Sequence, residues 1–335
     1  MQNIPLKQGP DMRTAALFAA ALVSLGLALG AAHAQGYPDR TIKVIVPFTP
    51  GSPVDAAGRV VVQHLQVRLG QSIIIENRPG AGTTIGTKAA AIAAPDGYTL
   101  LFIGPNFAYS KVLYPSLDFD PAKSFVPVAT AVTWSHVMVV AADLPITSVA
   151  ELVARAKADA GKLVFGYGLG TTPHILGESF QQAAGVQFTG IPYRGGEQAR
   201  ADLLGGRVHI NIAPVPTLLP LIREGKARPL AFTGPRRSPD LPDVPTMIES
   251  GLPQVGYDPD VWLGFFAPVG TPAAVIDKLN REVNAALKSP EATATLTKLG
   301  FEIKITTPQE FADFVAAEMV KWPPLLRAAG LKPEG

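Results

Sequence analysis

The chain contains no cysteine and carries little charge. Its 335 residues include 29 basic and 27 acidic side chains, for a net charge of +2. The lack of cysteine excludes a disulfide framework, thiolate chemistry and most structural zinc sites. The small net charge argues against a nucleic-acid-binding protein, which would show a basic surface. The length of the chain predicts about two domains.

Long apolar runs are also missing, except for one near the N-terminus. The run TAALFAAALVSLGLALG follows Lys7 and Arg13, and the small residues AHA end at Ala34. We therefore expect residues 1–34 to be a secretory signal peptide that is cleaved after Ala34, with the mature protein in the periplasm. A membrane anchor is the alternative, but no positively charged stop follows the run. Met12 offers an alternative start with a normal short basic region.

Short strands and helices alternate along the rest of the chain. The segments IKVIVPF, SIIIENR and YTLLFIG predict strands, and VDAAGRVVVQHLQVRLG predicts a helix between the first two. Such alternation predicts an α/β protein with mostly parallel sheets and helices on both faces. Near the C-terminus, one helical face is predicted to consist of Val275, Ile276, Leu279, Val283 and Leu287.

Two apolar stretches are candidates for strands that cross between domains. They are residues 125–142 and residues 261–269, VWLGFFAPV. We therefore predict two lobes, the first formed by residues 35–136 and 257–335 and the second by residues 137–256. A ligand site is expected in the cleft between the lobes, at the carboxyl ends of the strands.

One strand–turn–helix pattern occurs in both predicted lobes. The segments are VIVPFTPGSPVDAAGR and LVFGYGLGTTPHILGE. In each, a hydroxyl residue followed by proline, Ser52 or Thr172, is predicted to be the N-cap of the helix. A helix N-terminus presents unpaired N–H groups and a partial positive charge, which favour an anion.

Glycines and one acid decide how far this interpretation goes. Gly51, Gly168 and Gly170 would let the backbone approach a ligand closely. The alternative is that both turns are plain structural connections. Asp55 fits helix capping better than ligand contact, and Arg59 on the same helix is expected to be structural.

Several motifs resemble those of a known receptor family. They are PFTPGSPVDAAGR, IIENRPGAGTTIGTKAAAIAAPDGYTLLF, IPYRGGEQARADLLGG, RPLAFTGPRRSPDLPDVPT and GFFAPVGTP. In this order they resemble the extracytoplasmic solute receptors of tripartite tricarboxylate transporters, called Bug-type receptors, over the whole mature chain. The resemblance implies a two-lobed periplasmic binding protein fold of type II, with two crossover strands. It also implies a small carboxylate ligand, held partly through backbone groups and waters.

The resemblance and the side-chain chemistry together predict a set of ligand-binding residues. In the first lobe these are Thr49, Pro50, Gly51, Ser52, Thr83 and Asn106, and in the second Gly168, Gly170, Thr171, Thr172, His174 and Arg194.

Some of these side chains have alternative roles. Asn106 could donate to a carboxylate or serve as a turn residue. His174 could donate to an anion when protonated, or pack. Arg194 could pair with a carboxylate in a bidentate way, or lie on the surface. Trp134 and Trp262 are expected to pack at the hinge, although they could form an aromatic wall for an aromatic acid.

Other ligand classes find no support in the sequence. The place where amino-acid-binding members of the family carry an acid reads Ala213-Pro214 here, which argues against an ammonium partner. His64, His136 and His209 have no metal-like spacing with acids. We therefore predict no metal site, no cofactor and no catalytic residues.

These observations predict a monomeric periplasmic receptor. It would capture a di- or tricarboxylate or an aromatic carboxylate, close by hinge motion and deliver the ligand to a membrane permease. The alternatives are a sensing subunit that presents the ligand to a membrane sensor kinase, and an exported hydrolase, for which no nucleophile–base arrangement is present. The sequence leaves open which carboxylate binds, its affinity and the cognate permease.

Overall fold

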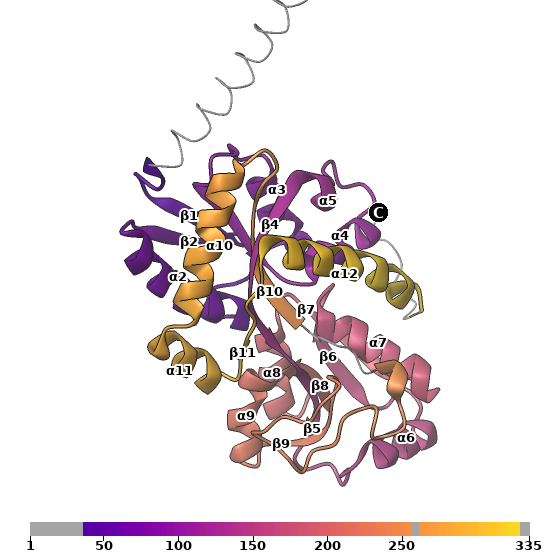
Figure 1. Ribbon diagram of the computed structural model, residues 1–335. Helices are drawn as coiled ribbons and strands as arrows, with labels where there is room; N and C mark the ends of the chain where they lie inside the picture. Colours follow the sequence, from indigo (N-terminus) through magenta and orange to yellow (C-terminus); the bar gives the residue numbers. More distant parts are fainter. Residues whose placement is uncertain (1–35, 256–260, 329–335) are drawn as a thin grey trace, which may run out of the picture.

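The computed structural model describes residues 36–255 and 261–328. These residues form two lobes, each built around one β-sheet (Figure 1). The predicted signal peptide lies outside the described residues. Within the described ranges, no helix is both long and apolar enough to cross a membrane.

The first lobe contains a six-stranded sheet. Its strands are β1 (Ile42–Val46), β2 (Ile73–Asn77), β3 (Thr99–Ile103), β4 (Phe125–Trp134), β10 (Val261–Pro268) and β11 (Glu302–Ile303). They lie in the order β11-β4-β10-β3-β1-β2. β1 pairs in parallel with β2 and β3, whereas β10 runs antiparallel to β3 and β4, and β11 runs antiparallel to β4.

The second lobe contains a five-stranded sheet. Its strands are β5 (His136–Ala141), β6 (Val164–Gly168), β7 (Thr189–Tyr193), β8 (Ile210–Pro214) and β9 (Ala227–Phe232). They lie in the order β7-β6-β8-β5-β9. β6 is parallel to β7 and β8, and β5 is antiparallel to β8 and β9.

The predicted α/β class and two lobes are confirmed, but both sheets are mixed rather than mostly parallel. The reason lies in the crossings between lobes. β4 ends at Trp134 and β5 begins two residues later in the other sheet. A strand that enters a lobe from the cleft runs away from it, opposite to strands that end there. β5 and β10 both enter in this way, and each lies between strands of the opposite direction.

The predicted lobe boundaries remain predictions in detail. Ser135 separates the strands of the two sheets, next to the predicted boundary after residue 136. The boundary predicted after residue 256 falls outside the described residues.

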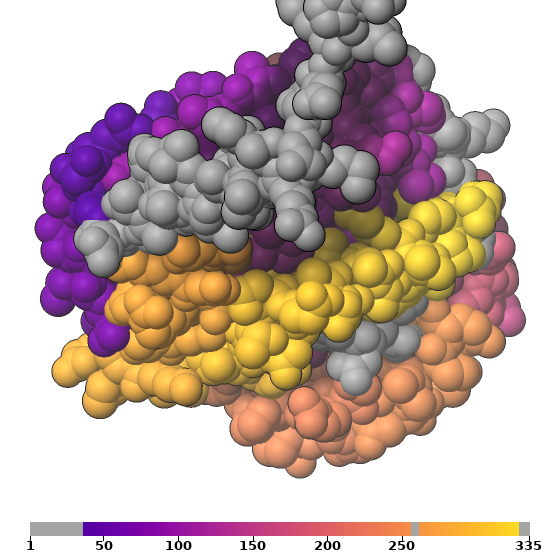
Figure 2. All heavy atoms as spheres, turned by 45° about the horizontal axis from the view of Figure 1, so that its top comes forward, coloured from indigo at the N-terminus to yellow at the C-terminus, as the bar shows by residue number. Residues whose placement is uncertain are grey.

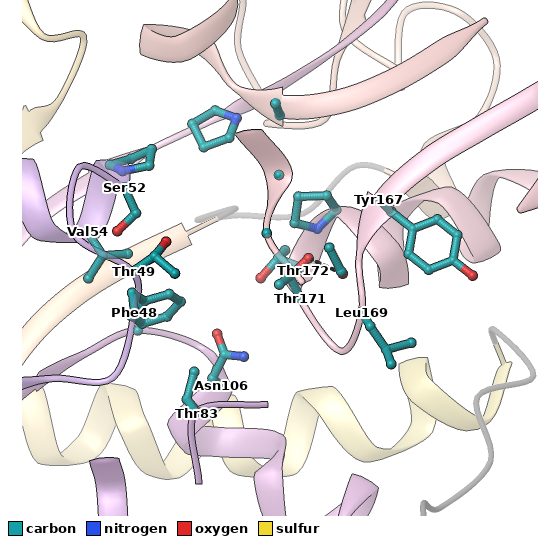
Figure 3. Close-up of a pocket in the computed structure, with 18 of the residues that line it drawn as sticks. Phe48, Thr49, Ser52, Val54, Thr83, Asn106, Tyr167, Leu169, Thr171 and Thr172 are labelled. Atoms are coloured by element: carbon teal, nitrogen blue, oxygen red, sulfur yellow. Dashed lines mark hydrogen bonds between the residues drawn. The ribbon is translucent and has the colours of Figure 1, made fainter. Parts of the chain in front are cut away.

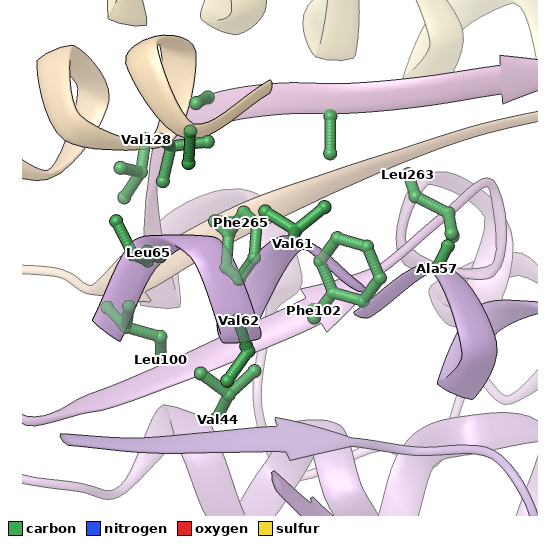
Figure 4. Close-up of a cluster of buried hydrophobic side chains, with 14 of the residues drawn as sticks. Val44, Ala57, Val61, Val62, Leu65, Leu100, Phe102, Val128, Leu263 and Phe265 are labelled. Carbon is green, nitrogen blue, oxygen red and sulfur yellow. The ribbon is translucent and has the colours of Figure 1, made fainter. Parts of the chain in front are cut away.

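Helices cover both faces of the first sheet. They are α2 (Pro53–Leu69), α3 (Thr84–Ala91), α4 (Asn106–Leu113), α5 (Pro121–Ser124), α10 (Ala273–Leu287), α11 (Pro290–Lys298) and α12 (Pro308–Ala328), with the short 3₁₀ helix η1 (Ala81–Thr83). The apolar faces of α2 and α10 pack on one face of the sheet, where Val61 and Leu65 meet Phe102 and Phe265 (Figure 4). All five α10 residues predicted on one face are buried in this cluster.

The second sheet is also covered on both faces. Its helices are α6 (Val149–Ala158), α7 (Thr172–Ala184), α8 (Gly196–Leu204) and α9 (Val215–Arg223), with the 3₁₀ helix η2 (Pro253–Val255). α6 and α7 contribute to one buried cluster, and α8 and α9 contribute to another. Ser148 is the N-cap of α6, because its Oγ accepts from the backbone N–H of Glu151 at 3.2 Å.

The C-terminal helix α12 joins the lobes. It packs against α4 and β4 of the first lobe, and it also contacts α7 of the second. Figure 2 shows it in yellow, running across the molecule toward the second lobe. Ile175 of α7 is buried in one apolar cluster with Tyr109 of α4 and Trp322 of α12, whose ring centroids are 5.2 Å apart. The two lobes are therefore in direct contact beside the cleft.

Candidate functional site

A cavity of about 850 Å³ lies between the lobes and is lined by residues of both. The strands end here, so the loops that follow β1 and β3 face the loops that follow β6 and β7. Figure 3 shows Thr49, Ser52 and Asn106 of the first lobe on one side and Thr171 and Thr172 of the second lobe on the other. The volume of the cavity suits a small-molecule ligand.

The first turn is held together by its own side chains. Ser52 is the N-cap of α2, as predicted, and its Oγ accepts from the backbone N–H of Asp55 at 3.3 Å. Pro53 occupies the first helical position, where its missing N–H costs nothing. Gly51 has a φ of +80°, a left-handed conformation that glycine adopts without strain.

Asp55 fills the positive end of this helix. Its carboxylate accepts from the backbone N–H of Gly51 at 2.9 Å and from Asn77 at 2.9 Å, and it pairs with Arg59 at 2.8 Å. Burial opposes its ionisation, but the hydrogen bonds from Arg59, Gly51 and Asn77 outweigh that effect and hold the pKa of Asp55 below its usual value. A protein carboxylate therefore already uses the Gly51 N–H that the sequence offered to a ligand.

The second turn is built differently, and one predicted detail is wrong. The N-cap of α7 is Thr171, not Thr172, because Thr171 keeps an extended backbone while Thr172 is the first helical residue. The Thr171 hydroxyl does not cap the helix. It donates to the backbone carbonyl of Gly168 at 2.7 Å and so closes the turn on itself. No acidic side chain lies in the first turn of α7.

The same turn carries a contact between the lobes. The carbonyl of Gly170 accepts from the Asn106 side chain at 3.3 Å and, more weakly, from the Tyr109 hydroxyl at 3.5 Å. Gly170 has a φ of +69°, and a Cβ there would lie 3.4 Å from the Tyr114 hydroxyl and 4.0 Å from the Cα of Gly82. A glycine therefore allows the second-lobe turn to approach the first lobe closely.

The charged groups of the cavity all come from the second lobe. Arg194, Glu197 and Arg200 line it, whereas the first-lobe wall consists of neutral residues. Within the described part of the chain, neither arginine has an ion-pair or hydrogen-bond partner. No group of three or more histidine, cysteine, aspartate or glutamate side chains in the described ranges could hold a metal ion.

Comparisons with known proteins identify the family. Residues 57–331 match the family model described as tripartite tricarboxylate transporter family receptor. The protein BugT of Bordetella pertussis is 38% identical over 89% of this chain and 92% of its own length. This chain belongs to that receptor family.

Solved structures of two similar proteins carry carboxylates. An R. palustris protein with adipate is 35% identical, with a TM-score of 0.83 over 89% of this chain and all of that one. MatC from Rhodopseudomonas palustris with bound malate is 31% identical, with a TM-score of 0.80 over 87% of this chain and all of that one. The fold is the two-lobed fold of periplasmic binding proteins, because the periplasmic binding protein BugD is 32% identical to this chain, with a TM-score of 0.82 over 89% of this chain and all of that one.

Most of the predicted ligand-binding residues line the cavity, but not all of them. Eight of the twelve line it: Thr49, Ser52, Thr83, Asn106, Gly168, Thr171, Thr172 and Arg194. Pro50, Gly51, Gly170 and His174 are not among the lining residues. For Gly51 and Gly170 the structure offers other roles, namely the Asp55 contact and the contact between lobes.

His174 does not have the environment of a charged anion donor. It is 8% exposed, its ring stacks on Tyr167 with centroids 4.1 Å apart, and its Nδ1 accepts from the backbone N–H of Gly170 at 3.4 Å. Burial lowers the pKa of His174 to about 4, so the ring is neutral near pH 7. Burial also lowers the pKa of the cavity-lining His136, to about 3.

Sequence reasoning missed several polar residues of the cavity, among them Glu197, Arg200 and Asn211. Glu197 and Arg200 lie in the first turns of α8, shortly after the predicted ligand-binding residue Arg194, and their spacing of three residues places them on one helical face. Asn211 is a polar residue in the apolar strand VHINIA, which is itself an unusual signal. Trp134 lines the cavity, whereas Trp262 is fully buried in the first lobe.

Proposed function

We propose that this receptor captures a small organic carboxylate in the interlobe cavity and delivers it to the permease of a tripartite tricarboxylate transporter. The observation that carries the proposal is the pair Arg194 and Arg200, which line the cavity without an ion-pair partner in the described residues. A carboxylate would supply the missing acceptor. The adipate and malate in similar receptors support the same ligand class.

Closure follows from the way the charges and donors are divided. The first-lobe wall offers the hydroxyls of Thr49 and Ser52, and the second lobe offers the two guanidinium groups. A ligand that contacts both walls binds the closed form better, and only this difference in affinity can shift the lobes toward closure. No chemical step belongs to the proposal, and we expect the receptor to act as a monomer.

A thermal-unfolding screen tests the ligand class. Di-, tri- and aromatic carboxylates are compared with sugars and with ammonium compounds that lack a carboxylate. A ligand present at about 100 times its dissociation constant should add about 2.7 kcal/mol to the free energy of unfolding. Stabilisation by sugars or cations, with no effect of any carboxylate, would overturn the proposal.

A pair of arginine variants then tests the site. Arg200→Gln should weaken carboxylate binding about tenfold or more, since a hydrogen bond to a charged group contributes roughly 1.5–3 kcal/mol. Arg155→Gln is the matched control, because Arg155 pairs with Asp159 on the surface of α6 in the same lobe. It should leave the affinity within about twofold, and equal losses in both variants would argue against a direct contact.

Export is the remaining part of the proposal. We propose that residues 1–34 direct the chain to the periplasm and are removed after Ala34, as the apolar run and the small residues before the cleavage point suggest. N-terminal sequencing of the mature protein from the periplasmic fraction should begin at Gln35. A mature chain that retains the apolar run would contradict cleavage.

A further inference from the structure

Three cavity-lining side chains hold a buried polar atom that has no hydrogen-bond partner in the described residues. They are Oγ1 of Thr83, Nε1 of Trp134 and Oδ1 of Asn211, and these residues are 6%, 6% and 1% exposed. Nearly all buried polar groups in folded proteins are paired with protein or water. Three such atoms around one cavity therefore indicate where a ligand, or its waters, would be bound.

The orientation of Asn211 is fixed by its neighbour. It lies on β8 opposite Gly166 of β6, and its Nδ2 donates to the Gly166 carbonyl at 2.8 Å. Only the nitrogen of the amide can donate to a carbonyl, so the unpaired atom is the oxygen. This oxygen can only accept a hydrogen bond.

The three atoms differ in what they require from a ligand. Trp134 Nε1 can only donate, and the Thr83 hydroxyl can donate, so both suit the oxygens of a carboxylate. A carboxylate has no hydrogen to offer Asn211, and its negative charge would repel the Asn211 oxygen. Carboxylate oxygens are therefore suitable partners for two of the three atoms, and the third needs a hydrogen-bond donor.

A neutral donor fits this place better than an ammonium group. Asn211 is 1% exposed, and burying a charge without a charged partner is costly. Ala213 and Pro214, which follow in the same strand and also line the cavity, supply no negative charge. Among the described residues that line the cavity, the one acidic side chain is Glu197, which lies on α8 and not on this strand.

We infer that the ligand is a carboxylate that also carries a neutral hydroxyl or amide group, and that Asn211 selects it by accepting a hydrogen bond from that group. This inference rests on the proposed carboxylate-binding function. It assigns Asn211 as a specificity-determining residue, and it narrows the ligand to hydroxycarboxylates and carboxamide-bearing carboxylates.

Titration calorimetry with matched ligand pairs tests the inference. The pairs differ in one neutral donor: malate and succinate, ω-hydroxyhexanoate and hexanoate, and the monoamide and monomethyl ester of adipate. The wild-type receptor should bind the donor-bearing member of at least one pair about tenfold more tightly, as expected for a buried acceptor that would otherwise stay unpaired. Equal affinities within every pair would overturn the inference.

Asn211→Leu tests the residue itself, because leucine has a similar size and no acceptor. In this variant the ratio of the two affinities within a pair should fall to about 1, because the ligand without the donor should bind as tightly as before or more tightly. A preference that survives the substitution would show that another group reads the donor. Leucine cannot bond the Gly166 carbonyl, so thermal unfolding must first show a folded variant, and Asn211→Ala serves in its place if it does not.

Two further outcomes separate this inference from the proposed function. If carboxylates bind without any preference for a neutral donor, the function stands and the inference fails. If no carboxylate binds, both fail. Aspartate is included beside malate, since tighter binding of the ammonium-bearing ligand would overturn the assignment of a neutral donor.

Discussion

The turns after β1 and β6 share a sequence pattern but differ in what they do. In the first, the Asp55 carboxylate accepts a hydrogen bond from the Gly51 N–H, and Ser52 caps the helix. The polar groups of this turn are therefore paired with its own residues. In the second, the carbonyl of Gly170 is bound by Asn106 of the opposite lobe. Two turns of like sequence thus serve different purposes: one is held by its own residues, and the other makes a contact between the lobes.

The cause of the difference is one acidic residue. An acid in the first turn of a helix compensates the positive end of that helix. α2 has such an acid, and α7 has none. The first lobe therefore presents hydroxyl groups to a ligand from a wall without charged residues. The unpaired positive charge of the cavity lies in the second lobe.

Loss of Asp55 should have the largest effect. Asp55→Ala removes a buried carboxylate that accepts from the Gly51 N–H and the Asn77 amide and pairs with Arg59, and we expect it to lower the free energy of unfolding by about 3 kcal/mol. Urea unfolding measures the change. Asp159→Ala, which removes a surface carboxylate of α6, is the control and should cost under about 1 kcal/mol. Similar losses would mean that the first turn is not held by Asp55.

Valine at the two left-handed glycines should separate the turns by function. Both Gly51→Val and Gly170→Val strain the backbone, because each φ is positive. Only the side chain at position 170 would meet the other lobe, at the Tyr114 hydroxyl, and nothing lies within 4 Å of a Cβ at position 51. Carboxylate affinity, measured by calorimetry, should fall about tenfold or more for Gly170→Val and stay within about twofold for Gly51→Val.

The same pair of variants decides the predicted ligand contact of Gly51. A large loss of affinity in a folded Gly51→Val protein would restore that contact and remove the contrast between the turns. Near-UV circular dichroism of each variant shows whether the fold is retained.

Removal of the Asn106 contact should have a smaller effect. Asn106→Leu deletes the hydrogen bond to the Gly170 carbonyl and should weaken closure by about 1 kcal/mol, or about fivefold in ligand affinity. Lys111→Ala, on the exposed side of the same helix, should change nothing measurable. Small-angle scattering of the ligand-free protein should show a more open form of Asn106→Leu, and an unchanged profile would argue against a role in closure.

The smallest effect is expected from pH. The pKa of His174 is lowered to about 4, so its charged form is populated only below that pH in the folded protein. Carboxylate affinity should therefore vary less than about twofold between pH 6 and pH 8. A histidine that gripped the ligand as a cation would instead lose affinity above about pH 6.5. Calorimetry at both ends of the range distinguishes the two.

The local features of the fold could be predicted from the sequence. The alternation of strands and helices, the Ser52 cap and the buried face of α10 follow from patterns within a few residues, and the structure agrees with them. The sequence predicts the N-cap of α7 one residue too late. Either of the two consecutive threonines could be the N-cap, and the backbone conformation decides which one is.

The direction of the strands could not be read in the same way. Each segment alone predicts a strand, but whether it runs toward the cleft depends on the lobe from which the chain arrives. β5 and β10 enter from the cleft and make both sheets mixed.

The sequence by itself determined the elements, the family and eight of the residues that line the cavity, because these depend on local pattern and motif. Only the tertiary structure decided which polar groups are already paired. The Gly51 N–H donates to Asp55, and His174 is buried beside Tyr167. Arg200 of α8 and Asn211 of β8 line the cavity. The physical reason is that a hydrogen bond or a desolvation cost depends on what lies nearby in space.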